Sequence, residues 1–87
     1  MYCENISIEN AIKKYDVIQS QIDDIILELI KTRKKKKITQ TQLSKSTGVP
    51  QATISRLESF STVPTLNLLL KLCSALNLKL VLNPNDE

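Results

Sequence analysis

The chain has 87 residues with 41% hydrophobic content, enough for one small domain with appendages. It contains no histidine and one glycine, which leaves no Ser-His or Cys-His catalytic pair and no glycine-rich phosphate loop. Cys3 and Cys73 do not make a metal-ligand cluster, so we expect no enzyme activity, no metal and no cofactor. The net charge is +3, and no segment resembles a membrane span or a secretion signal, so we expect a cytoplasmic protein without membrane contacts.

Residues 7–47 contain neither glycine nor proline and should be largely helical. Two apolar phases meet near Asp16, which can cap a new helix, so we favour two helices joined there over one long helix. The first helix has an apolar stripe made by Ile8, Ala11, Ile12 and Tyr15. This stripe would either fold back on the rest of the chain or dock on another subunit or partner.

A basic run follows, with six of the seven residues 31–37 being Lys or Arg, whereas most carboxylates lie upstream of it. A charge run is often only a solvated face. Beside a DNA-reading element, however, clustered lysines neutralise phosphates and make affinity depend steeply on salt. We therefore expect Lys36 and Lys37, at the end of the run, to contact DNA phosphates.

Two short helical patterns come next, hinged at the only glycine of the chain. Thr39 and Gln42 have the spacing of a capping box, and Gly48 can close the first helix. Pro50 suits the first position of a second helix, which should run to about Ser59. The outward face of this second helix is polar and nearly uncharged: Gln51, Ala52, Ser55, Arg56 and Ser59. Such side chains can hydrogen-bond base edges or phosphates.

The pairs Thr39-Gln40, Leu43-Ser44, Gly48-Val49, Ile54-Ser55 and Leu57-Glu58 make this stretch resemble the helix-turn-helix of phage-repressor (Xre-type) regulators. The resemblance implies an all-α, lambda-repressor-like domain of five helices, which we place at residues 17–78, with residues 1–16 as an N-terminal helical extension. It also implies binding to double-stranded DNA. Ser44 departs from the usual alanine, and Phe60 stands where a glycine is common.

Carried over position by position, the resemblance assigns roles to individual residues. The base-reading helix would present Gln51, Ala52, Ser55, Arg56 and Ser59 to DNA, with Thr53 near a phosphate and Gln40 on the DNA backbone. Arg33 and Glu58 would form a structural ion pair. A phosphate contact is the alternative for Arg33.

Thr65 should cap a further helix that runs from Leu66 to about Asn77 and is apolar on two sides. Cys73 belongs to its core face. Its second face, with Leu68 and Leu72, needs a cover, and we expect a second subunit there, with the N-terminal helix as the alternative.

We assign residues 79–87 to a dimerisation strand and tail. Leu78, Leu80 and Leu82 alternate along this segment and would lie on one face of a strand. A lone strand with unpaired amides is a template for another chain. We therefore expect the strand, including Val81, to pair antiparallel across a homodimer; a helical continuation is the alternative.

The segment ALNLKLVLNP after the helix-turn-helix resembles the HigA and HipB types of antitoxin. This resemblance implies a homodimer that binds a palindromic operator and represses its own operon. It also implies that the protein binds a toxin, either an RNA-cleaving enzyme or a kinase. Ile8, Ile12 and Tyr15 are the candidate toxin contacts. A phage-type or chromosomal repressor without a toxin is the alternative, and a protein interaction module that has lost DNA binding is a third possibility.

Overall fold

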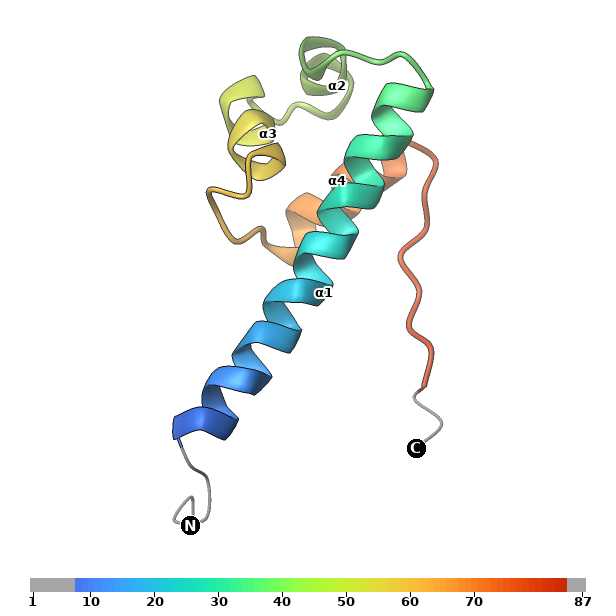
Figure 1. Ribbon diagram of the computed structural model, residues 1–87. Coiled ribbons are helices and arrows are strands. Elements are labelled where there is room, and N and C mark those ends of the chain that lie inside the picture. Colours follow the sequence, from blue (N-terminus) through green and yellow to red (C-terminus); the bar gives the residue numbers. More distant parts are fainter. Residues whose placement is uncertain (1–7, 85–87) are drawn as a thin grey trace.

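The computed structural model describes residues 8–84, and for residues 8–15 it describes the backbone alone. The described residues form four helices and no strand: α1 (Ile8–Lys35), α2 (Gln40–Thr47), α3 (Gln51–Glu58) and α4 (Leu66–Ala75). Figure 1 shows α2, α3 and α4 gathered around the C-terminal half of α1, whose N-terminal half extends beyond them. The all-helical fold class predicted from the sequence is therefore confirmed.

The predicted joint near Asp16 is wrong, because α1 runs through this position as one helix of 28 residues. The stretch contains no glycine or proline, and one Asp is too weak a signal to interrupt a helix that both neighbouring turns propagate. The extension and the first domain helix are thus the same element. The described part of the chain consequently has four helices, where the sequence predicted five in the domain and a separate extension.

The core lies between the C-terminal half of α1 and the other three helices. Its buried residues come from every helix and from the α2–α3 turn: Ile26, Leu29, Leu43, Val49, Ile54, Leu57, Leu69, Leu72, Cys73 and Leu76. Leu72 is only 2% exposed, so this residue, which the sequence assigned to a dimer contact, is covered by its own chain. Leu68 also packs partly against the core. The apolar excess of α4 is instead at Leu66 and Leu70, which are exposed.

Three helix ends carry a non-glycine residue with a positive φ: Lys37, Phe60 and Asn77. Phe60, at φ 60°, follows α3 at the position where the sequence comparison expected glycine. The Phe60 amide donates to the Leu57 carbonyl (3.1 Å) and the Ser61 amide to the Arg56 carbonyl (3.0 Å), the two bonds of a Schellman motif. The chain thus turns after α3 as it would with glycine, and the Phe60 side chain is 45% exposed rather than packed beneath the loop.

The segment after α4 runs back along α1 in the opposite direction (Figure 1) without regular secondary structure as far as residue 84. Leu78 packs against the core, Leu80 is half-buried and Leu82 is 96% exposed. The strand predicted for this segment is thus not formed within the single chain. No helix in residues 8–84 is long and apolar enough to cross a membrane.

Candidate nucleic-acid interface

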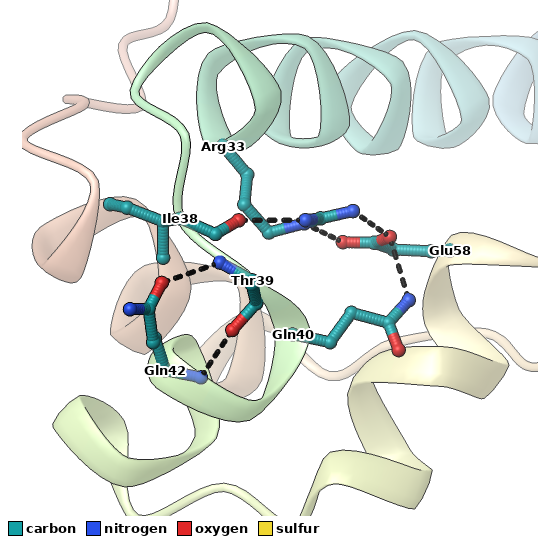
Figure 2. A network of polar contacts seen from close by, with 6 residues as sticks. All are labelled: Arg33, Ile38, Thr39, Gln40, Gln42 and Glu58. Atoms are coloured by element: carbon teal, nitrogen blue, oxygen red, sulfur yellow. Dashed lines mark hydrogen bonds and ion pairs between the residues drawn. The ribbon is translucent and has the colours of Figure 1, made fainter.

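The helix-turn-helix begins at a capping box, as the spacing of Thr39 and Gln42 predicts. The Thr39 hydroxyl accepts a hydrogen bond from the Gln42 amide (3.0 Å), and the Gln42 side-chain oxygen accepts one from the Thr39 amide (2.8 Å; Figure 2). Two amide donors that α2 cannot satisfy internally are therefore paired. This capping sets where α2 begins relative to the end of α1.

The turn between α2 and α3 is held by Gly48 and Ser44. Gly48 has a φ of 78°, which costs glycine little, and its amide donates to the Ser44 carbonyl (2.9 Å). The Ser44 hydroxyl, in place of the alanine usual in the family, donates to the Val49 carbonyl (2.5 Å) across the turn. Pro50 precedes α3 as its N-cap, one position earlier than predicted.

Arg33 of α1 and Glu58 at the end of α3 form the ion pair expected from the sequence. The Arg33 Nε lies 2.7 Å from Glu58 Oε2, and Arg33 Nη2 lies 2.8 Å from Oε1, so the pair is bidentate. Their side chains are 10% and 13% exposed. Arg33 also donates to the Ile38 carbonyl (2.8 Å), and Gln40 of α2 donates its amide to Glu58 Oε1 (3.0 Å; Figure 2). One carboxylate thus joins α1, α2 and α3.

The electrostatics of this network favour the charged carboxylate. Burial alone raises the pKa of Glu58, but the hydrogen bonds from Arg33 and Gln40, with the charges of Arg33 and Lys34, outweigh it and leave the pKa below its ordinary value. A charged Glu58 in turn satisfies the buried Arg33 guanidinium. Among the described residues, no buried side-chain nitrogen or oxygen is without a hydrogen-bond partner.

Gln40 has a different role in the structure from the one that the family resemblance implies. The sequence comparison placed its side chain on the DNA backbone, whereas in the structure it is half-buried and donates to Glu58. Gln40 thus ties the start of α2 to the end of α3. The motif spacing carried no signal for this contact, which depends on how the helices fold together.

The outer face of α3 is open, with Gln51, Ala52, Ser55 and Arg56 exposed and Thr53 half-buried. Within residues 8–84, the side chains of Gln51, Ser55 and Arg56 make no hydrogen bond to another side chain or to the backbone. Ser59 differs, because its hydroxyl donates to the Arg56 carbonyl (3.1 Å) and lies 2.7 Å from that of Ser61. The structure therefore leaves three polar side chains of α3 free and engages Ser59 in the helix end.

The basic run continues from α1 into the loop, and Lys34, Lys35, Lys36 and Lys37 are all exposed residues. The Lys36 Nζ donates to the carbonyl of Leu76, the C-cap of α4 (2.5 Å). Cations are favoured at this end of a helix because its carbonyls are unpaired. Lys36 therefore joins the ends of α1 and α4, a contact that a run of similar lysines could not reveal.

In the described part of the chain, no three His, Cys, Asp or Glu residues lie together as metal ligands would. Cys73 is a free, buried core residue, and burial raises the pKa of its thiol. Cys3 lies outside the described residues, as do the side chains of Ile8, Ile12 and Tyr15, the candidate toxin contacts.

The helix-turn-helix family model matches residues 29–83, more than half of the chain. The matched region contains the ion pair, the capped turn and the open face of α3. The chain belongs to this family of Xre-like helix-turn-helix proteins and is a DNA-binding transcriptional regulator. Comparison with curated proteins and with solved structures found no significant match.

The lowered pKa of Glu58 predicts a pH-dependent contribution to stability. Because the folded-state pKa lies below the unfolded value of about 4.3, the contribution is complete above that value and is lost as the pH falls through the folded-state pKa. We expect Glu58→Gln to lower the free energy of unfolding by roughly 3 kcal/mol at pH 7, and the difference from wild type to shrink below about pH 4. Chemical denaturation across this pH range measures both effects.

Glu28→Gln is the matched control, because Glu28 is exposed and lies 3.9 Å from the Lys31 ammonium. Such a surface pair contributes at most about 1 kcal/mol, so this variant should follow the wild-type curve. A difference between wild type and Glu58→Gln that stays constant down to pH 3 would contradict the assignment.

Proposed function

We propose that the protein is a sequence-specific antitoxin that represses its own operon as a dimer and neutralises a toxin. The DNA-reading part of the proposal rests on one observation, the open polar face of α3 beside a buried network that orients it. Gln51 can pair with adenine and Arg56 with guanine or a phosphate, and Ala52 can contact a thymine methyl group. Ser55 and Thr53 would complete the contacts to bases and phosphates.

The basic run supplies the part of the affinity that does not depend on sequence. Lys37 is exposed and has no hydrogen-bond partner among the described side chains, so we assign it to a phosphate. Lys36 would reach DNA only by leaving the Leu76 carbonyl. Gln40 and Ser59 would likewise have to exchange their internal hydrogen bonds for contacts to the DNA backbone.

Changing Arg56 or Gln51 to Ala should weaken binding to the protein's own promoter DNA by about 1–3 kcal/mol, while binding to unrelated DNA changes little. Lys71→Ala is the control that removes one exposed positive charge on α4 and should leave the selectivity for the promoter intact. Gel-shift titrations on both DNAs at fixed salt measure the two affinities. Wild-type selectivity in both α3 variants would rule out a base-reading role.

Dimer formation is proposed through the segment from Leu78 to Leu82. Beyond Leu78 this segment makes no backbone hydrogen bond with another described residue, and both Val81 and Leu82 are exposed. An extended segment with free amides and apolar side chains can pair with its copy about a two-fold axis. A symmetric dimer would place two α3 helices in successive major grooves of a palindromic operator, about 34 Å apart.

Leu80→Pro removes an amide donor from the middle of the proposed pairing and should yield monomers. Asn83→Pro, just beyond the pairing, should leave the dimer intact. Sedimentation equilibrium distinguishes the two states, with circular dichroism showing that both variants remain helical. A dimeric Leu80→Pro protein would exclude the paired-segment arrangement.

The toxin partner separates the proposal from its alternative, a plain repressor of phage or chromosomal type. Both have the same DNA-facing residues, so DNA binding cannot distinguish them. The exposed apolar side chains of α1, which lie outside the DNA-reading face, favour the antitoxin, because a protein partner could cover them: Val17, Ile18 and Leu27. Co-purification with the product of an adjacent, co-transcribed reading frame, an RNA-cleaving enzyme or a kinase, tests the antitoxin role. A transcription unit without such a reading frame would favour the plain repressor.

A further inference from the structure

The N-terminal half of α1 projects away from the body of the molecule (Figure 1). We call residues 16–28 of α1, which run from this projecting part to the edge of the core at Ile26, the α1 arm. The arm lies before residue 29, where the match to the family begins. Three of its apolar side chains are more than half exposed: Val17 (59%), Ile18 (55%) and Leu27 (53%).

One apolar stripe runs along the arm and into the core. Ile18, Ile22, Ile25 and Leu29 are spaced four, three and four residues apart, the spacing of a seam between two packed helices. Ile18 is exposed, Ile22 and Ile25 are half-buried, and Leu29 is 5% exposed. The stripe that packs α1 on its own domain therefore continues past the domain with one side uncovered.

A groove adjoins this stripe where the arm meets the body. Its walls are Asp24, Ile25, Glu28 and Leu29 of α1 on one side and Cys73 with residues 78–80 on the other, and its volume is about 290 Å³. This is at the lower limit of pockets that hold small ligands, about 300–1,000 Å³. The groove is open and continuous with the stripe, so a few side chains of a docked polypeptide suit it better than an isolated ligand.

The charge of the arm indicates what kind of polypeptide would bind there. Residues 16–30 contain four carboxylates and no basic residue. Two of these carboxylates, Asp24 and Glu28, line the groove on the side of α1, and Lys79 on the opposite wall is the one basic residue among the described residues that line it. DNA is repelled by such a surface. A second copy that paired through the same residues would place carboxylates against carboxylates, so a surface of opposite charge is favoured.

We propose that the α1 arm binds an amphipathic helix of a different protein, with apolar residues along one stripe and Lys or Arg beside them. The apolar side chains would cover Ile18 and Ile22 and extend the core of the domain, and the basic side chains would meet Asp24 and Glu28. This inference deepens the proposed function, because it states where a partner such as a toxin docks and what its contact surface is like.

A designed peptide of about 18 residues with a leucine stripe and lysines elsewhere is the probe, with a peptide of the same leucine pattern carrying glutamates for comparison. Fluorescence anisotropy with the full chain should show binding of the lysine peptide and not of the glutamate peptide. Ile18→Asp should weaken it by about tenfold or more. Leu27→Asp should not, because Leu27 is equally exposed but lies on the opposite side of α1. Asp24→Lys with Glu28→Lys should reverse the preference between the peptides.

Equal binding to the Ile18→Asp and Leu27→Asp proteins would overturn the proposal, as would an unchanged preference after the charge reversal. A change of oligomeric state in Ile18→Asp would also overturn it, because a second copy would then cover the stripe. Promoter binding is measured on every variant in parallel. Intact promoter binding without peptide binding refutes the docking surface alone, whereas loss of promoter selectivity in the α3 variants is the separate test of DNA reading.

Discussion

The Arg33–Glu58 ion pair is the contact on which the arrangement of the DNA-facing helices depends. The helices α2 and α3 have eight residues each, too short to be stable alone, so their positions are set by the surfaces they pack against. The ion pair attaches the end of α3 to α1, and Gln40 attaches the start of α2 to the same carboxylate. Because both charges are nearly buried, leaving one without its partner is costly, and the network therefore favours one arrangement of the three helices.

The α1 helix carries two surfaces of opposite charge, one after the other along its length. Its C-terminal turns carry the basic residues beside the helix-turn-helix, while residues 16–30 carry carboxylates and no basic residue. In the proposed function, electrostatic repulsion from phosphates would direct the acidic part away from DNA, so one helix would serve a DNA contact and a protein contact without competition between them. A continuous helix, in contrast to two joined ones, also links these surfaces rigidly.

The sequence predicted the local features well, because caps, turns and the helix-turn-helix motif depend on residues close together in the chain. Thr39, Gln42 and Gly48 take the conformations that their spacing indicated. The prediction failed where the position or burial of a residue depends on contacts with residues far away in the chain. The phase change near Asp16 does not interrupt the helix, and Leu72 is buried by its own chain. Similarly, Lys36 differs from its neighbours only because the end of α4 lies within its reach.

We infer that the ion pair positions α3 for DNA binding and does more than add stability. Replacing both partners, Arg33→Met with Glu58→Leu, removes the buried charges together, so stability should be close to that of wild type, whereas each single change should be strongly destabilising. The decisive measurement is the promoter affinity of this double variant at a temperature where it is fully folded. We expect weakened, less selective binding; wild-type affinity and selectivity in a stable double variant would contradict this role of the ion pair.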